Sequence, residues 1–346
     1  MNIDRKPIGQ TAAWRVNRRA FLTGTGAAGL CLSGVGIVSS AVAEEKPWQP
    51  TRPIRLIVPY PPGGGIDIVG RFIAPKLQDG LDQTVIVENK PGAVGMIGSE
   101  YVYRSPPDGY TYVVASADTH SINPHVYTGL RYKASEFSPA AAIARLDYMF
   151  VARPDLPVST IKDVIELARR QELTYASSGV GSSAQVVTEA LKARYKLKLL
   201  HVPYAGSGPA AGAIMGSQVD LLMVPIAIAL ASRAKMKILG VASATRFAGA
   251  PDIPSLAEQG YPIGLDAAWI GLMGPPHTPR PALERIHGIV DRIVREPGTR
   301  ERLLALGLMP YTATLDEFSS QTKAAYQSWG EVVAAAGIHA DSTQLN

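Results

Sequence analysis

The sequence predicts an α/β protein whose sheets are mostly parallel and carry helices on both faces. Short runs of β-branched and aliphatic residues alternate along the chain with segments of helical periodicity, which is the pattern of repeated βαβ units. The runs are apolar throughout, as expected for strands that are buried on both faces of a sheet. Clusters of glycine and serine directly follow several runs, at the sheet edge where α/β proteins bind ligands.

Residues 1–43 are interpreted as an export signal and are excluded from the fold. Arg18 and Arg19 precede an uncharged stretch rich in Gly, Ala, Ser and Val, which ends at Ala41-Val42-Ala43. This is the order of a basic region, an apolar region and an A-x-A cleavage site. The paired arginines indicate a Tat-type signal peptide, cleaved near Ala43, and a periplasmic protein. A transmembrane anchor is the alternative reading, but the many glycines lower the hydrophobicity of the stretch.

Excluding residues 1–43 lowers the formal net charge of the chain. The full chain has a formal net charge of +5, from 34 basic and 29 acidic residues. The segment holds five of the basic residues and one acid, which leaves 29 basic and 28 acidic side chains. A nearly neutral chain gives no reason to expect a nucleic-acid partner. The only cysteine, Cys31, also lies in the segment, so the mature chain has no disulfide or cysteine metal site.

The first half of the mature chain predicts one αβ unit. Strands are expected at 54–58, 84–87 and 111–115, with helices near 66–79 and 96–104 between them. Pro75 falls inside the first of these helices, so a kink or an early end is expected there.

A second unit follows, with strands expected at 148–152, 173–176, 199–202, 219–224 and 238–242. Thr160 and Asp163 have the spacing of a capping box and should open a helix, and Ser255 and Glu258 should open one short helical turn. From Pro279 onward the chain is expected to be helical, with Thr314 opening the last helix.

Two loops have the composition of anion-binding sites. The first, Tyr60–Asp67, contains Gly63, Gly64 and Gly65 and opens a helix; the second, Ser177–Ser183, contains two glycines and four serines and also precedes a helix. Glycines let the backbone approach a ligand, and the N–H groups and dipole at a helix N-terminus favour an anion. The alternative for each is an ordinary structural turn, in which Asp67 or a serine caps the following helix.

Other motifs carry less information. The loop at 116–120 and the loop after the 199–202 strand, which holds Tyr204, are weaker candidates of the same kind. His120 and His125 are five residues apart with Pro124 between them, a poor spacing for a shared metal, so both are predicted to be structural. Gly24–Gly29 matches G-x-G-x-x-G but lies in the export signal with no strand before it. No catalytic residue, metal or cofactor is predicted, although an α/β hydrolase using a serine of these loops remains the alternative.

The loops and turns together resemble a known family, the Bug-type (tripartite tricarboxylate transporter, TctC-like) periplasmic substrate-binding proteins. The segments that carry the resemblance are Pro53–Asp67, Val85–Gly95, 107–111, 122–124, Ser177–Ser183, His201–Gly206, Gly216–Asp220 and Pro251–Gly260. The resemblance covers nearly all of the mature chain and rests on the order and spacing of these segments.

This resemblance implies a periplasmic-binding-protein (Venus-flytrap) fold, with two domains joined by two crossover strands. Domain 1 would combine 44–147 with 267–346, and domain 2 would be 148–266. A monomeric receptor would hold a small carboxylate and deliver it to a membrane transporter or a sensor subunit. The implied ligand-binding residues are Tyr60, Gly63, Gly64, Asp67, Ser116, Ser178, Gly181, Ser182, Ser183 and Tyr204. Gln185 departs from the family, which often has a histidine at this position.

Overall fold

The computed structural model describes residues 48–262 and 268–341, which lie in one compact unit. The predicted export signal falls outside the described residues. Among the described helices, none is both long enough and apolar enough to cross a membrane.

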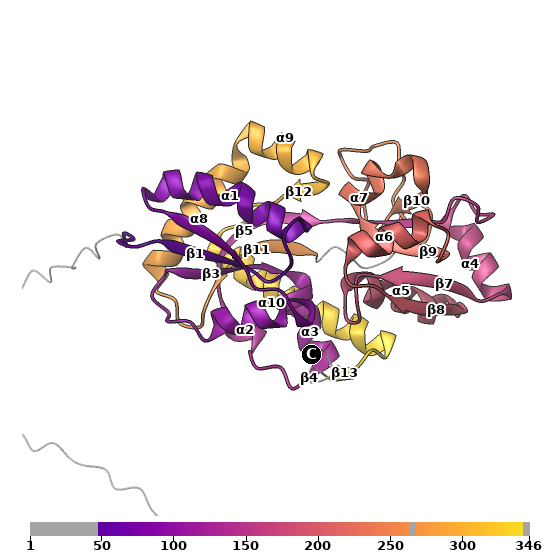
Figure 1. The fold of residues 1–346 in the computed structure, drawn as a ribbon, viewed down its shortest axis with the longest axis horizontal. Coiled ribbons are helices and arrows are strands. Elements are labelled where there is room, and N and C mark those ends of the chain that lie inside the picture. Colours follow the sequence, from indigo (N-terminus) through magenta and orange to yellow (C-terminus); the bar gives the residue numbers. More distant parts are fainter. Residues whose placement is uncertain (1–47, 263–267, 342–346) are drawn as a thin grey trace, which may run out of the picture. The chain divides into compact units, whose positions relative to one another are not determined.

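The first sheet has six strands in the order β12-β5-β11-β3-β1-β2 (Figure 1). Its strands are β1 (Ile54–Val58), β2 (Val85–Asn89), β3 (Thr111–Ser116), β5 (Ser138–Leu146), β11 (Trp269–Gly274) and β12 (Leu308–Pro310). β1 pairs in parallel with β2 and β3, with Leu56 opposite both Val87 and Tyr112. β11 runs antiparallel to β3 and β5, so the parallel part of the sheet continues into an antiparallel part.

The second sheet repeats this plan with five strands in the order β10-β6-β9-β7-β8. Its strands are β6 (Tyr148–Ala152), β7 (Leu173–Ser177), β8 (Leu199–Pro203), β9 (Leu221–Pro225) and β10 (Lys237–Val241). β7 pairs in parallel with β8 and β9, and β6 is antiparallel to β9 and β10. Only Asp147 separates β5 of the first sheet from β6 of the second.

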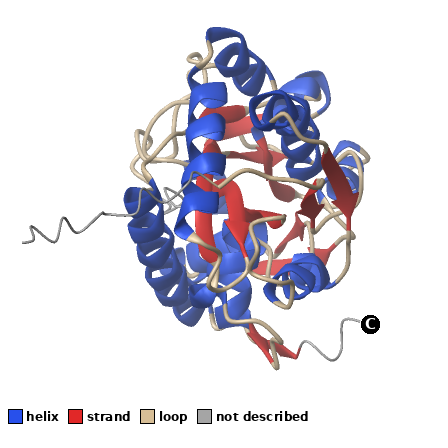
Figure 2. Ribbon diagram, turned by 90° about the vertical axis from the view of Figure 1, so that its left-hand side faces the viewer, coloured by secondary structure: helices blue, strands red, loops and turns tan. Residues whose placement is uncertain are grey.

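Helices lie on both sides of the strands (Figure 2). The α-helices are α1 (Gly65–Leu81), α2 (Met96–Tyr103), α3 (Asn123–Val126), α4 (Ile161–Arg170), α5 (Ser183–Tyr195), α6 (Ser207–Met215), α7 (Ile226–Ala231), α8 (Arg280–Arg295), α9 (Pro297–Ala305) and α10 (Leu315–Ala336). A π-helical turn, η2 (Asp118–Ile122), follows β3, and a short pair, β4 (Tyr127–Thr128) with β13 (Ala340–Asp341), forms a separate ladder. The C-terminal helix α10 packs against α5, which follows a strand of the second sheet.

Most predicted strands and helices are present, with ends within about two residues of those expected. The expected early end of the first helix is wrong, because α1 continues through Pro75 to Leu81. Ile73, Leu77 and Leu81 are buried on its inner face, and their burial outweighs the one backbone hydrogen bond that proline removes.

The single helical turn expected after Ser255 is present, because its capping hydrogen bonds form and the Gln259 N–H donates to the carbonyl oxygen of Ser255 at 3.3 Å. The Ser255 backbone N–H donates to Glu258 Oε2 at 2.8 Å, and the Glu258 N–H donates to Ser255 Oγ at 3.0 Å. The segment is a hydrogen-bonded turn that ends at Gly260, whose φ of +85° lies outside the helical region.

Three strands of the first sheet, β5, β11 and β12, were not predicted from the sequence, and neither was the short pair of β4 with β13. β5 contains Ala140, Ala141, Ala142 and Ala144, and alanine has a stronger preference for helices than for strands. β11 contains two glycines, and the Cβ atom of any other residue at Gly271 would lie 2.5 Å from the carbonyl oxygen of Ala141. Tertiary packing at the centre of the sheet therefore determines these strands.

The capping box of α4 gives a first testable prediction. The Asp163 N–H donates to Thr160 Oγ1 at 3.2 Å, and the Thr160 N–H donates to Asp163 Oδ2 at 2.9 Å. Thr160→Ala should lower the free energy of unfolding by about 1 kcal/mol in urea titrations. Ser159→Ala is the matched control, and an equal loss in both variants would contradict the capping assignment.

Candidate functional site

The first glycine loop lies between β1 and α1, at the carboxyl end of the parallel strands. Gly64 is the N-cap residue of α1, and no side chain caps this helix. Gly63 has a φ of +84°, a left-handed conformation that favours glycine. The helix therefore begins with backbone N–H groups that no N-cap side chain satisfies.

Asp67 fixes the conformation of this loop through hydrogen bonds within the chain. Its carboxylate accepts hydrogen bonds from the Gly63 N–H at 2.9 Å, Asn89 Nδ2 at 2.8 Å and Arg71 Nε at 3.0 Å. Burial alone would raise the pKa of Asp67, but the hydrogen bonds from Arg71, Gly63 and Asn89 hold it below its ordinary value of 3.8. The structure thus places Asp67 in a network internal to the chain, with its charge compensated by Arg71.

The second loop lies between β7 and α5. The Ser182 hydroxyl donates to the carbonyl oxygen of Gly179 at 2.7 Å and accepts a hydrogen bond from the Gln185 N–H as the N-cap of α5. Ser183 begins the helix, and its hydroxyl donates to Tyr148 Oη at 2.8 Å. Both serines are almost completely buried, whereas Ser178 is half-buried.

A polar chain of Gln185, His201 and Ser177 supports this loop. Gln185 Oε1 accepts from the Gly181 N–H at 2.7 Å, so its amide nitrogen faces Nδ1 of His201 at 3.2 Å. This makes Nδ1 the acceptor and Nε2 the protonated nitrogen, which lies 2.7 Å from Ser177 Oγ. Burial lowers the pKa of His201, which favours the neutral ring that this chain requires. Gln185 thus fixes the backbone of Gly181.

The Ser177–His201 pair has the spacing of a catalytic serine and its base, so it bears on the hydrolase alternative. Ser177 is completely buried, and its hydroxyl donates to the carbonyl oxygen of Gly179 at 3.0 Å. A nucleophile must reach a substrate carbonyl, and this oxygen lies beneath the loop instead. The geometry assigns the pair to support of the loop.

The second loop contacts Tyr127 of β4, which lies in the chain between β3 and β5 of the first sheet. Tyr127 Oη donates to the carbonyl oxygen of Val180 at 2.6 Å. A Cβ atom at Gly181 would lie 2.9 Å from Cε2 of Tyr127, so only glycine allows this close approach. Gly181 also has a φ of +77°. These contacts bring segments more than 50 residues apart in the chain to one place.

Asp118, which was not predicted as a site residue, lies at this junction. It begins η2, directly after β3, and its carboxylate is close to the backbone N–H and hydroxyl of Ser183. Burial raises the pKa of Asp118 to about 6, because the interactions with Ser183 only partly offset the loss of water. Burial, and after it the negative charge of Asp118, raises the pKa of Tyr127 and Tyr148, whose hydroxyls lie nearby.

Tyr60 and Ser116 complete the lining on the first-sheet side. Both hydroxyl oxygens are buried, and among the described residues each has only the other hydroxyl as a possible hydrogen-bond partner. The Tyr60 hydroxyl lies near Ser116 and Asp118, and burial raises its pKa well above 10.0. The structure therefore brings together Tyr60, Ser116 and Ser183 of the predicted set, with Asp118 and Tyr148 added.

Tyr204, a predicted site residue, and His120 and His125, predicted to be structural, make contacts outside this group. Tyr204 packs partly buried against the core of the second sheet, and its N–H donates to the carbonyl oxygen of Ser177. His120 Nδ1 lies 2.8 Å from Thr119 Oγ1, and His125 Nε2 lies 2.8 Å from the carbonyl oxygen of Tyr326. The two histidines thus contact different protein groups.

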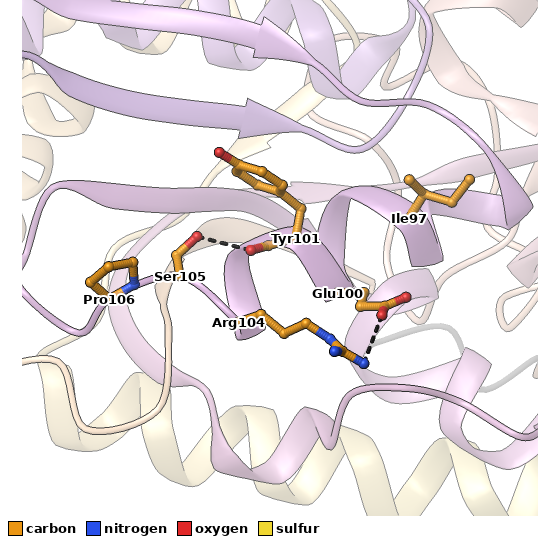
Figure 3. Close-up of a pocket in the computed structure, with 6 residues that line it drawn as sticks. All are labelled: Ile97, Glu100, Tyr101, Arg104, Ser105 and Pro106. Atoms are coloured by element: carbon orange, nitrogen blue, oxygen red, sulfur yellow. Dashed lines mark hydrogen bonds and ion pairs between the residues drawn. The ribbon is translucent and has the colours of Figure 1, made fainter.

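A hollow of about 470 Å³ lies beside α2, away from both loops (Figure 3). Its polar residues interact with each other: Arg104 pairs with Glu100 at 3.0 Å, and the Ser105 hydroxyl donates to the carbonyl oxygen of Tyr101 at 2.8 Å. None of its lining residues belongs to the predicted site, so the loops and not the hollow define the candidate site.

The support of the second loop can be tested with Gln185→Leu. This change removes the acceptor of the Gly181 N–H and the donor to His201, which leaves buried polar groups without partners. The free energy of unfolding should fall by about 1–3 kcal/mol in urea titrations. The exposed Gln171→Leu provides the control; if Gln185→Leu loses no more stability than this control, the network is not a support.

Asp118 predicts an unusual dependence of stability on pH. A pKa raised from 3.8 to about 6 means that folding stabilises the protonated carboxyl group, so stability falls as the pH rises through this interval. Asp118→Asn should therefore raise the free energy of unfolding by about 1–3 kcal/mol at pH 7.5 and by almost nothing at pH 4. Urea titrations at both pH values, with the exposed Asp79→Asn as control, measure this; a gain that is independent of pH would contradict it.

Comparison with known proteins places this geometry in a family. Residues 69–338 match the family described as the tripartite tricarboxylate transporter family receptor. BugT of Bordetella pertussis is 29% identical over 315 residues, which cover 89% of this chain and 96% of the relative. A UPF0065 protein from the tcbD-tcbE intergenic region of Pseudomonas sp. strain P51 is 30% identical, covering 87% of this chain and 92% of the relative.

Solved structures agree with these relatives. R. palustris Rpa4515 with adipate has a TM-score of 0.78 and 28% identity, and covers 84% of this chain and 99% of its own. MatC of Rhodopseudomonas palustris with bound malate has a TM-score of 0.74 and 27% identity, and covers 82% and 99%. The expected resemblance and the two-lobed α/β fold are thus confirmed: this chain belongs to the tripartite tricarboxylate transporter (TctC) family of receptors, a family of periplasmic solute-binding proteins.

Proposed function

We propose that the protein is a periplasmic receptor that captures a small carboxylate and passes it to a membrane transporter or a sensor partner, without catalysis. The observation that carries the proposal is the start of α1. A 17-residue helix begins there behind three glycines, with no side-chain cap, and the loop is held in shape by Asp67. Such a helix end attracts a carboxylate without a lysine or arginine.

The surroundings of this helix start support the same ligand class. The buried hydroxyls of Tyr60 and Ser116, which lie beside each other, can donate to a bound carboxylate. The relatives with adipate and with malate hold small carboxylates in their structures. The hydroxyls of Ser182 and Ser183 are engaged with Gly179 and Tyr148, which favours a binding role over a nucleophilic one.

We further propose that each sheet is the centre of one lobe, with domain 1 formed by 44–147 and 267–346 and domain 2 by 148–266. The single residue between β5 and β6 supports a hinge at Asp147. The second crossing of the chain lies between β10 and β11. Opening about these two segments would admit a ligand to the loops, as in other receptors of two lobes. The receptor is proposed to act as a monomer after export to the periplasm and removal of the predicted signal peptide.

Gly64→Val tests the role of the first loop. Gly64 has a φ of −77°, and an added Cβ atom would have its nearest contact at 3.7 Å, with the carbonyl oxygen of Pro61. The variant should therefore fold normally, but valine methyl groups at the helix start should weaken carboxylate binding at least tenfold, which is 1.4 kcal/mol.

The measurement is isothermal titration calorimetry of wild type and variant with a panel of mono- and dicarboxylates that includes adipate and malate. Gly288→Val, on an exposed face of α8 where an added Cβ atom has no neighbour within 4 Å, is the matched control. Equal affinity in wild type and Gly64→Val would remove the first loop from the site.

A further inference from the structure

Tyr127 of β4 joins the second loop to the other proposed lobe. Its hydroxyl donates to the carbonyl oxygen of Val180 at 2.6 Å, and a Cβ atom at Gly181 would lie 2.9 Å from its Cε2 atom. Tyr127 is only 4% exposed. It belongs to the proposed domain 1, whereas the loop belongs to domain 2. Both partners of the contact are protein groups, so its strength does not depend on which ligand is bound.

The backbone around Tyr127 is fixed by the C-terminal segment of the described chain. Tyr127 pairs with Ala340 of β13, and His125 Nε2 lies 2.8 Å from the carbonyl oxygen of Tyr326 in α10. A Cβ atom at Gly330 would lie 2.8 Å from Cε1 of His125, so α3 and α10 are in close contact. The ring and hydroxyl of Tyr127 are therefore ordered where the second loop meets them, which reduces the entropy lost when that contact forms.

A second contact between the proposed lobes lies beside the proposed hinge. A Cβ atom at Gly307, just before β12, would overlap the backbone nitrogen of Ala227 in α7. The adjacent Ile226 N–H donates to the carbonyl oxygen of Asp147 at 3.2 Å. Figure 1 shows β12 and α7 near the top of the molecule and β4 at its lower edge. Contacts beside a hinge can persist while the lobes rotate, so opening of the loops must break the Tyr127 contact.

We propose that Tyr127 is a positioning residue for ligand capture: its hydrogen bond to Val180 and its packing on Gly181 hold the second loop in place when the lobes close, and so stabilise the closed form around any ligand. This inference rests on the proposed receptor and its two lobes. Because the ligand is held in the closed form, a change at Tyr127 shifts the affinity for every ligand by one common factor. A residue that contacts the ligand would instead change the ranking of ligands.

The test compares Tyr127→Phe with Tyr132→Phe. Tyr132 is equally buried, and its hydroxyl donates to the carbonyl oxygen of Thr119 at the same 2.6 Å, but both of these residues belong to domain 1. Calorimetry with the carboxylate panel, adipate and malate included, should show binding to Tyr127→Phe weakened about fivefold for every member that binds, as expected for one net hydrogen bond. Stopped-flow fluorescence should place this change in the dissociation rate. Tyr132→Phe should lose similar stability in urea but bind as wild type does.

Gly181→Ala provides a second variant. The added methyl group would meet the Tyr127 ring, so this change should weaken binding at least tenfold in the wild-type background. In a Tyr127→Ala background the ring is removed, and the same change should weaken binding less. An equal loss in both backgrounds would overturn the contact that the inference requires.

The other outcomes separate this inference from the receptor proposal. Wild-type affinity in Tyr127→Phe would overturn the role of Tyr127 and leave the receptor intact. A reversed ranking of two carboxylates in Tyr127→Phe would also overturn it, because Tyr127 would then act on the ligand directly. Failure of every carboxylate to bind wild type, while the protein is folded by circular dichroism, would overturn the receptor proposal and this inference together.

Discussion

The two loops can present backbone N–H groups to a ligand only because hydrogen bonds to neighbouring polar side chains fix their conformation. A glycine-rich loop is flexible by itself, and the entropy lost on ordering it would weaken binding. Asp67, with Arg71 and Asn89, holds the first loop, and Gln185, with His201 and Ser177, holds the second. Both supports use buried or partly buried polar atoms whose bonding capacity is satisfied within the chain. The rest of the site depends on this pre-organisation.

Two carboxylates near the loops, the buried Asp67 and the partly exposed Asp118, have opposite environments. Asp67 accepts hydrogen bonds from Arg71, the Gly63 N–H and Asn89, so its pKa is low and its charge is compensated. Burial raises the pKa of Asp118 to about 6, and the N–H and hydroxyl of Ser183 lower it only in part. A protein tolerates such a cost in stability where the group serves a function, because selection acts on the folded, active molecule.

The second loop also shows how one support can be built from different residues. The amide of Gln185 performs two tasks, one as an acceptor and one as a donor. Gln185 accepts from Gly181 and donates to His201, and this pair of bonds sets the tautomer of His201. His201 in turn holds Ser177 beneath the loop, so a serine–histidine pair that looks catalytic by distance is structural by burial.

Local pattern was sufficient for much of the fold and for the position of the loops. Apolar runs and capping boxes identified the parallel strands and helices α1, α4, α5 and α10, because these elements follow from side-chain periodicity and local hydrogen bonds. The antiparallel strands β5 and β11 could not be predicted in this way, since alanine and glycine become strand residues there only through packing against neighbours distant in the chain. The same distinction between local pattern and tertiary packing applies to the residues of the candidate site. Composition alone identified the glycine and serine loops, but tertiary structure decided that Asp67 is satisfied internally and that Asp118 faces Ser183, because the solvation of a carboxylate depends on what surrounds it in space.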